Sequence, residues 1–201
     1  YPLEAQRAEA MAKRRIGLGL TGLADALAMC GLVYGTDEAA AAAAQWMATI
    51  EHGAYRASAD LARERGAFPL FDPARFGMSG HAASLPEAPR AQIYTHGIRN
   101  GLLTSIAPTG TISLLAGNVS SGIEPVFDFS YLRRIREEGE RVVEETVEDY
   151  AHRLYRSLRG ASAPLPPAFV TAAALSPRQH VEMQAALQAH VDSSISKTIN
   201  C

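Results

Sequence analysis

The chain has 201 residues, and its 19 lysine and arginine residues against 21 aspartate and glutamate residues give a formal net charge of −2. This near balance argues against a broad attraction to nucleic acid or to an anionic membrane. No apolar run reaches the ~20 residues that a membrane span requires. The two cysteines, Cys30 and Cys201, lie far apart in the sequence. They predict no disulfide framework and suit a reducing, cytoplasmic setting.

The first half of the sequence predicts helices. Residues 4–32 read as helix with a break near Gly17, and residues 37–65 read as one long helix capped by Thr36 or Asp37. Its apolar residues at helical spacing are Met47, Ile50, Ala54, Ala57 and Leu61. Four prolines in residues 68–89 predict an irregular loop, which a short helix over 91–98 follows.

The second half mixes helices with short apolar strands. Residues 102–107 and 127–136 read as strands, a turn falls at Glu138 and Gly139, and 197–200 begins a third strand. An amphipathic helix is expected over 141–158, and Ser176 and Pro177 open a last helix. The apolar residues expected along that last helix are Met183, Leu187, Val191 and Ile195. The fold class that this predicts is α/β, predominantly helical, in a single domain over residues 1–201.

The most informative stretch is NGLLTSIAPTGTISLLAGNVSSGIEPVF, residues 100–127. Pro108 ends the strand, Thr109 is a favourable N-cap, and residues 110–115 can begin a helix whose first amides have no partners. A helix N-terminus of this kind can bind an anion, and Gly110 would let an oxyanion approach the backbone. The hydroxyls of Thr109, Thr111 and Ser113 could add donors. The sequence therefore allows a phosphate site built from neutral donors.

The same stretch also fits an ordinary capped turn between a strand and a helix, which is a common arrangement. The continuation Ser120-Ser121-Gly122 forms a second turn, and Glu124 follows it among apolar neighbours. A carboxylate there is costly to bury without hydrogen bonds. Glu124 therefore either accepts bonds from the facing loop and supports it or lies at the surface.

The wording of several segments resembles the large, catalytic chain of ribonucleotide reductase. The segments are RRIGLGLTGLADAL at 14–27, THGIRN at 95–100, APTGTIS at 107–113, SSGIEP at 120–125 and HVDSSISKTIN at 190–200. The five blocks occur in order between residues 14 and 200, so the resemblance extends over nearly the whole chain and is specific. The forms PTGTIS and SKTIN are most similar to the adenosylcobalamin-dependent class.

The resemblance implies a part of the ten-stranded α/β barrel of a ribonucleotide reductase, from the C-terminal portion of the barrel. The enzyme converts ribonucleotides to deoxyribonucleotides by thiyl-radical chemistry, with adenosylcobalamin as cofactor. The residues that would line the substrate diphosphate are Pro108, Thr109, Gly110, Thr111, Ile112 and Ser113, with Glu124 as loop support. The implied partners are a ribonucleoside di- or triphosphate, the remainder of the same polypeptide, and another copy of the protein.

The radical chemistry of that family needs a cysteine in an Asn-Xaa-Cys-Xaa-Glu loop and a redox-active cysteine pair. Neither Cys30 nor Cys201 stands in such a context. The chain is therefore expected to be a piece of a longer polypeptide that is inactive alone, with no catalytic residue of its own. Two other interpretations stay open: a standalone module that binds phosphorylated ligands without catalysis, and a purely structural helical domain.

Other patterns suggest sites that their context does not favour. Gly17, Gly19 and Gly22 match a dinucleotide-binding GxGxxG pattern, but a basic helical stretch precedes them, so close helix packing explains them better. The six histidines include no HExxH pair and no cysteine partners, which argues against zinc. Residues 144, 145, 148 and 149 read as a solvated acidic helix face. Arg133, Arg134 and Arg136 precede three glutamates and suggest surface ion pairing.

Overall fold

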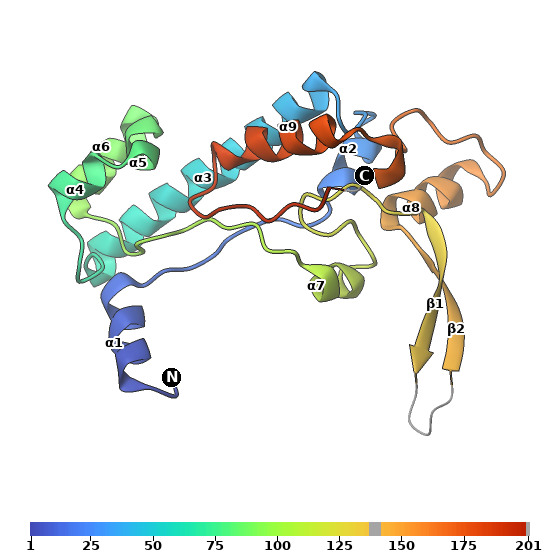
Figure 1. Cartoon of the computed structure of the whole chain (residues 1–201). Helices are drawn as coiled ribbons and strands as arrows, with labels where there is room; N and C mark the ends of the chain where they lie inside the picture. The colour runs from blue at the N-terminus through green and yellow to red at the C-terminus, as the bar shows by residue number, and fades with distance from the viewer. Residues whose placement is uncertain (137–141, 200–201) are drawn as a thin grey trace. The chain divides into compact units, whose positions relative to one another are not determined.

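The structure is a computed structural model that describes residues 1–136 and 142–199 (Figure 1). Its α-helices are α1 (Glu4–Lys13), α2 (Leu23–Met29), α3 (Asp37–Arg65), α4 (Pro73–Gly77), α5 (Gly80–Ser84), α6 (Glu87–His96), α7 (Gly110–Leu115), α8 (Tyr150–Arg159) and α9 (Pro177–Gln188). A 3-10 turn, η1, spans Ala172–Ala174. Strands β1 (Ser130–Arg136) and β2 (Val142–Glu148) form a two-stranded sheet. The described chain is predominantly helical, as the sequence predicts.

Two compact units make up the fold, and each draws on separate stretches of the sequence. The first contains residues 1–19, 44–106 and 186–195. The second contains the described residues among 20–43, 107–185 and 196–201. Helices α3 and α9 each contribute residues to both units.

The core of the first unit joins α3 to the helices that follow it. Its buried members are Tyr55, Ala59, Leu85, Ile93, Ile98 and Leu103, with Phe68, Phe71 and Phe76 packed against them. The three phenylalanine rings meet edge-on or tilted, with centroids 5.6 Å apart in each successive pair. The prolines of 68–89 therefore do not leave an irregular loop, because Asp72 and Ser79 cap α4 and α5 within this stretch. Helix α6 begins at Glu87, earlier than the sequence indicates.

Extended segments lie side by side in the first unit. The amides of Ile16 and Leu18 donate to Leu102 and Leu103, at 3.0 and 2.8 Å, and Leu18 pairs with Thr104 in a parallel bridge. From the C-terminal stretch, the Ser193 amide donates to the Thr104 carbonyl at 3.3 Å. The strand expected over 102–107 is thus extended and paired in parallel, although the pairing is local. The last expected strand is not observed at residues 197–199, and residue 200 lies outside the described residues.

The glycines of the GxGxxG pattern serve this close pairing. A Cβ at Gly17 would lie 2.4 Å from Ser105 Oγ, and one at Gly19 would lie 2.1 Å from the Ser105 carbonyl oxygen. The glycines do pack closely, but they join extended segments, so the prediction of helix packing was wrong. The helix expected over 4–32 is interrupted between Lys13 and Leu23, and Gly22, at φ +81°, precedes α2.

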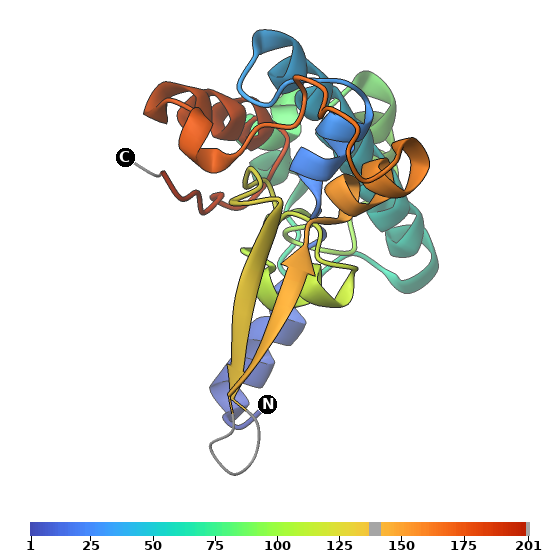
Figure 2. The same ribbon diagram turned by 90° about the vertical axis from the view of Figure 1, so that its right-hand side faces the viewer.

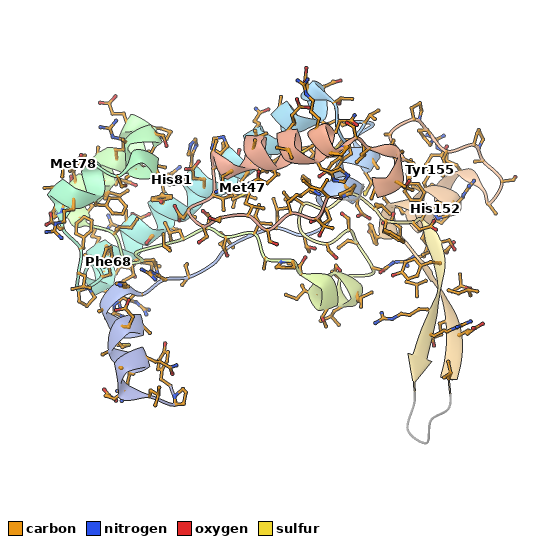
Figure 3. The ribbon with its side chains drawn as sticks, viewed as in Figure 1. Met47, Phe68, Met78, His81, His152 and Tyr155 are labelled. Carbon is orange, nitrogen blue, oxygen red and sulfur yellow. The ribbon has the colours of Figure 1, made fainter. Side chains whose placement is uncertain are left out.

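Helix α3 has the expected bounds and the expected cap, because Thr36 Oγ1 accepts a hydrogen bond from the Ala39 amide at 3.2 Å. Its buried face differs from the expected stripe. The buried residues are Ala39, Ala43, Met47, Glu51, Tyr55, Ser58, Ala59 and Ala62. Met47, labelled in Figure 3, is the only residue of the expected stripe among them. The prediction was wrong because a glutamate and a serine occupy this face and hide its period.

The prediction of a helix over 141–158 was wrong in its first half. Residues 142–148 form β2, which pairs antiparallel with β1 from Ser130–Glu148 to Arg136–Val142 (Figure 2). Val142, Val143, Thr146 and Val147 are β-branched and favour the extended backbone. The Asp149 side chain then accepts a hydrogen bond from the His152 amide and starts α8. The turn expected at Glu138 and Gly139 lies outside the described residues.

Aromatic packing holds α8 in the second unit. His152 and Tyr155, labelled in Figure 3, each face an aromatic ring of another segment. The Phe129 ring stacks on His152 at 5.7 Å and meets Phe169 at 5.6 Å, and Tyr155 meets Phe169 at 5.4 Å. Helix α9 opens at Pro177 as expected, but Val191 and Ile195 are buried beyond its end. None of the described helices combines the length and apolar character needed to cross a lipid bilayer.

Replacing Gly19 with alanine should destabilise the chain by about 2–4 kcal/mol, because the new Cβ would meet a backbone oxygen that cannot move alone. Gly53→Ala is the matched control. A Cβ there meets nothing within 4 Å inside α3, so it should raise the free energy of unfolding by about 0.5–1 kcal/mol. Urea denaturation measures both changes. A G19A chain as stable as the parent would contradict the close contact.

Candidate functional site

Residues 108–113 lead into the short helix α7 in the second unit. Thr109 has φ 52° and occupies the position before Gly110. The Ser113 amide donates to the Thr109 carbonyl at 2.8 Å, whereas the amides of residues 110–112 lie in the first turn, where a helix offers no acceptor. A Cβ at Gly110 would meet nothing within 4 Å. The start of α7 therefore presents backbone donors beside open space.

The hydroxyl of Thr109 does not cap α7, contrary to the expectation from sequence. Its Oγ1 accepts a hydrogen bond from the Gly122 amide at 2.7 Å and lies 2.9 Å from Thr21 Oγ1. The Thr109 backbone is left-handed where its side chain points to these two partners. The hydroxyl thus joins the 108–113 loop to the 120–122 turn.

The remaining predicted loop residues divide between the surface and the interior. Pro108, Thr111 and Ile112 are exposed, whereas Ser113 is buried. Ser113 Oγ donates to the Gly110 carbonyl at 2.9 Å and lies 3.1 Å from Ser121 Oγ. Thr111 is therefore the hydroxyl that the loop leaves at the surface, while those of Thr109 and Ser113 hold the loop in place.

A cavity of about 460 Å³ lies against this loop within the second unit. Its walls come from α7, the turn after it, β1 and the C-terminal segment. The polar residues in these walls include Ser113, Asn118, Ser121, Glu124, Asp128, Arg133, Asp149 and Thr198. Arg134 pairs with Glu144 across the hairpin, at 2.8 Å, whereas the three glutamates expected as partners lie outside the described residues. Arg133 instead lines the cavity, so it brings a positive charge to the walls.

Glu124 has different partners from those expected. Its carboxylate accepts a hydrogen bond from the Thr198 amide at 2.8 Å and forms an ion pair with Lys197. The Lys197 ammonium also lies 3.0 Å from His180 Nδ1 and donates to the Thr198 carbonyl at 2.9 Å. Burial, and then the charge of Lys197, lower the pKa of His180. Glu124 therefore fixes the C-terminal segment at the cavity wall, and its main partners lie outside the 108–113 loop.

Two buried aspartates were missed by the sequence reasoning. Asp25, on α2, is 3% exposed, and so is Asp149, which was assigned to a solvated helix face. The two Asp25 oxygens accept the amides of Ser120 and Ala151, at 2.7 and 3.0 Å. A single acid within the apolar run LADALAM, and an aspartate just before an amphipathic helix, are the signals that could have found them.

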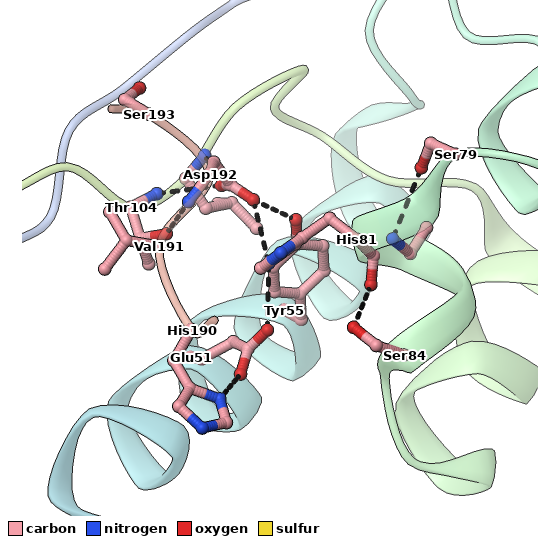
Figure 4. A network of polar contacts seen from close by, with 12 residues as sticks. Glu51, Tyr55, Ser79, His81, Ser84, Thr104, His190, Val191, Asp192 and Ser193 are labelled. Atoms are coloured by element: carbon pink, nitrogen blue, oxygen red, sulfur yellow. Dashed lines mark hydrogen bonds and ion pairs between the residues drawn. The ribbon is translucent and has the colours of Figure 1, made fainter. Parts of the chain in front are cut away.

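A second polar cluster lies in the first unit, around Asp192 (Figure 4). One Asp192 oxygen accepts the amides of Leu103 and Thr104, at 2.7 and 2.9 Å. The other accepts the Tyr55 hydroxyl at 2.5 Å. The Asp192 amide donates in turn to Thr104 Oγ1 at 2.8 Å. Asp192 thus ties the extended segment before the 108–113 loop to α3.

His81 joins this cluster to Glu51. Its Nε2 lies 2.8 Å from Glu51 Oε1 and 3.1 Å from Asp192 Oδ1, although neither approach has the alignment of a regular hydrogen bond. His190 Nδ1 lies 2.8 Å from the other Glu51 oxygen. The Glu51 contact and the Asp192 charge raise the pKa of His81 against its burial. Burial opposes ionisation of Glu51, but contacts with His81 and His190 outweigh it and lower the pKa of Glu51.

No group of three or more histidine, cysteine, aspartate or glutamate side chains in the described residues is arranged to hold a metal ion. Cys30 is exposed, and Cys201 lies outside the described residues. His96 is exposed at the end of α6. The chemistry that the described site offers is therefore binding and orientation through amides, hydroxyls and one arginine.

The comparison with protein families gives a match over residues 1–201 to the family described as "Ribonucleotide reductase, barrel domain". The chain belongs to the ribonucleotide reductase family. The match includes the 108–113 loop and the Asp192 segment.

Relatives within ribonucleotide reductase share the whole chain or most of it. The chain is 39% identical to a vitamin B12-dependent ribonucleoside-diphosphate reductase of Mycobacterium tuberculosis and 32% identical to one of Thermoplasma acidophilum, over 100% of its length. It covers 29% and 26% of these two proteins. The Escherichia coli ribonucleoside-diphosphate reductase 1 subunit alpha is 29% identical over 76% of the chain and 22% of that protein. The chain thus spans less than a third of these relatives.

The His81 cluster should make the stability of this ribonucleotide reductase chain depend on pH. The raised pKa of His81 contributes stability that is present below its ordinary value of 6.5 and is lost as the pH rises through the folded-state value. The lowered pKa of Glu51 contributes stability above its ordinary value of 4.5. Both contributions are therefore present together at about pH 5.5, between these two values.

Replacing His81 with glutamine should lower the free energy of unfolding more at about pH 5.5 than at about pH 8.5. Urea denaturation at the two pH values measures this difference. Gln6→Ala is the control, because Gln6 is an exposed residue of the same unit with no ionisable group, so its loss should shift stability equally at both pH values. An equal loss in H81Q at both pH values would rule out the charged cluster.

Proposed function

We propose that this chain supplies the diphosphate-binding loop of a ribonucleotide reductase, in a complete enzyme that reduces ribonucleotides to deoxyribonucleotides. The observation that carries the proposal is the cavity of about 460 Å³ against residues 108–113. Its size falls within the range of small-molecule sites. Relatives that are named ribonucleoside-diphosphate reductases support a ribonucleoside diphosphate as the substrate.

The diphosphate would meet backbone donors at the start of α7. The amides of residues 110–112 have no intrahelical acceptor, and the open space over Gly110 admits an oxyanion. Helix α7 has six residues, so its dipole is small and direct hydrogen bonds carry the interaction. Thr111 adds an exposed hydroxyl. Thr109 and Ser113 contribute by holding the loop.

The positive charge for the diphosphate would come from Arg133. Arg133 lines the cavity, whereas Lys197 is 6% exposed and is paired with Glu124. An arginine suits a phosphate because its planar group donates two parallel hydrogen bonds. Glu124 would support the site by holding the C-terminal segment in place.

The scaffold would be one domain, over residues 1–201, of a ten-stranded barrel that the remainder of the polypeptide completes. The parallel pairing of residues 16–18 with 102–105 supports it, because parallel segments with helical connections build α/β barrels. A second parallel bridge joins Val126 to Thr171. We place the complete enzyme in the cytoplasm, where thiols stay reduced, and we expect it to self-associate.

Adenosylcobalamin would be the cofactor of the complete enzyme, as the names of the vitamin B12-dependent relatives support. The residues of this chain do not fit that group. The cavity at the loop is of nucleotide size, and the two cysteines lack the Asn-Xaa-Cys-Xaa-Glu setting. The radical and redox thiols must come from another part of the polypeptide, and this chain alone should be inactive.

The rival function is a module that binds phosphorylated ligands without catalysis. It shares the loop, so binding alone cannot separate the two. Reduction of a ribonucleoside diphosphate by the complete polypeptide favours the reductase, whereas binding with no turnover in any cobalamin-loaded preparation favours the module.

Replacing Gly110 with valine tests the loop. The side chain would enter the open space at the start of α7 and block the oxyanion, so the affinity of the complete polypeptide for a nucleoside diphosphate should fall about tenfold or more. The measurement is equilibrium binding of the nucleotide by calorimetry.

Stability and a second site provide the controls for G110V. A Cβ at Gly110 meets no protein atom, so the free energy of unfolding should change by less than about 1 kcal/mol. Gly53→Val, on an open face of α3 in the other unit, should leave the affinity unchanged. Unchanged affinity in G110V would refute the diphosphate loop.

A further inference from the structure

The 120–122 turn is held by Thr21, Gly22 and the first turn of α2, through every polar group of Ser120. The Ser120 carbonyl accepts the Gly22 amide at 2.7 Å and the Thr21 hydroxyl at 3.0 Å. Its Oγ accepts the Ala24 amide at 3.1 Å. Its own amide donates to Asp25 Oδ2 at 2.7 Å. Asp25 is the charged member of this set, and a buried carboxylate that accepts an amide makes a strong hydrogen bond.

The same turn reaches the proposed diphosphate loop directly. The Gly122 amide donates to Thr109 Oγ1 at 2.7 Å, and Ser121 Oγ lies 3.1 Å from Ser113 Oγ. A displacement of Ser120 would therefore move the partners of both hydroxyls that hold the loop. Asp25 itself does not line the cavity, but it binds the amide of Ser120, which does.

Asp25 also fixes the start of α8, through the Ala151 amide at 3.0 Å. Asp149, the cap of α8, lies beside Asp25: its own carboxylate accepts the His152 amide, and Asp25 accepts the Ala151 amide of the same helical turn, both at 3.0 Å. Asp149 also lines the cavity. Both aspartates are 3% exposed. Two buried carboxylates that accept amides of one helical turn cannot both stay ionised at low cost, so the pair is stable when it shares one proton.

The geometry points to Asp25 as a positioning residue for the diphosphate loop, held in place by a proton that Asp149 shares with it. With both Asp25 oxygens occupied by amides, the proton belongs on Asp149, which can then donate to Asp25. Without that proton the two charges repel, and the 120–122 turn loses its anchor. This inference rests on the proposed function of the loop.

Other charged groups near the pair do not replace the proton. Glu148 and His152 flank Asp149, and the His152 ring lies 3.8 Å from the Glu148 carboxylate. The Arg156 Nε lies 3.3 Å from His152 Nε2. Arg153 points to the Gly117 carbonyl, at 3.2 Å, and Asp128 and Glu124 line the same cavity. Burial first, and then the charge of Asp25, raise the pKa of Asp149 to about 7.

The direction of the pH effect follows from that raised pKa. The pair contributes stability to the 120–122 turn. This contribution is fully present below the ordinary Asp149 pKa of 3.8 and is lost as the pH rises through the folded-state value of about 7. Nucleotide affinity should therefore fall with rising pH. If only the protonated pair holds the loop, the dissociation constant should rise about tenfold between about pH 6 and pH 8.

Two asparagine substitutions in the complete polypeptide separate the roles. In Asp149→Asn the amide donates to Asp25 permanently and its oxygen still accepts the His152 amide, so it mimics the protonated state. Its affinity for a nucleoside diphosphate should match the parent at about pH 6 and lose most of the parent's fall by pH 8. Ionisation of the nucleotide affects both proteins equally, so their difference isolates the pair.

Asp25→Asn keeps the shape but has one acceptor oxygen for two amide donors, and its amide group then faces an N–H. Nucleotide affinity should fall about tenfold at both pH values. If D25N does not fold, the pH profile of nucleotide binding by D149N tests the inference by itself. A D149N profile as steep as the parent's would overturn the shared proton, and parent-like binding by folded D25N would overturn the positioning role.

Gly110→Val separates these failures from that of the proposed function. If G110V weakens binding while D25N and D149N bind as the parent does at both pH values, this inference fails and the diphosphate loop stands. If G110V binds as the parent does, the loop itself is refuted.

Discussion

The candidate site depends on how the 120–122 turn is held. The 108–113 loop has few hydrogen bonds of its own: the Thr109 hydroxyl and the Ser113 hydroxyl both find partners in this turn. Thr21, Gly22 and the first turn of α2 fix the 120–122 turn, because together they bind every polar group of Ser120. A loop that must leave its amides free for a ligand cannot use them to fix itself. Its order has to come from side chains, and those side chains need a rigid partner.

Carboxylates take the place of regular sheet pairing at several points of the described chain. Asp192 accepts the amides of Leu103 and Thr104, Asp25 accepts those of Ser120 and Ala151, and Glu124 accepts that of Thr198. In each case a side chain from one segment binds the backbone of a different segment. Backbone amides without a neighbouring carbonyl need another acceptor, and these carboxylates supply one in extended segments and at the start of α8. The cost is a set of buried charges, which the chain offsets with His81 at Asp192 and Lys197 at Glu124, and with a shared proton at Asp25.

Local signals were sufficient for the starts of α3 and α9. Thr36 and Ser176-Pro177 start α3 and α9 where the sequence places them, because capping involves neighbours within four residues. Residues 142–148 were misread because Val143 and Val147 satisfy the helical period as well as the strand period. The face of α3 was misread because Glu51 is buried through contacts with residues 81 and 190, which no local pattern contains. The loop was singled out from its wording, whereas Asp25 was missed because its partners, Ser120 and Ala151, lie 95 and 126 residues away along the chain. Asp149 was missed because it was assigned to the interior of a helix that begins only after it.

The surface around the cavity suggests what the site needs beyond this chain. Ile112, Leu115 and Phe127 border the loop and the cavity with exposed fractions of 60%, 91% and 78%. Exposed apolar side chains beside a polar cavity are typical of a surface that another part of a protein covers. In a complete reductase, covering these side chains would exclude water from the diphosphate end of the substrate. Hydrogen bonds from amides, and the charge of Arg133, would then act in a less polar medium, where each is stronger.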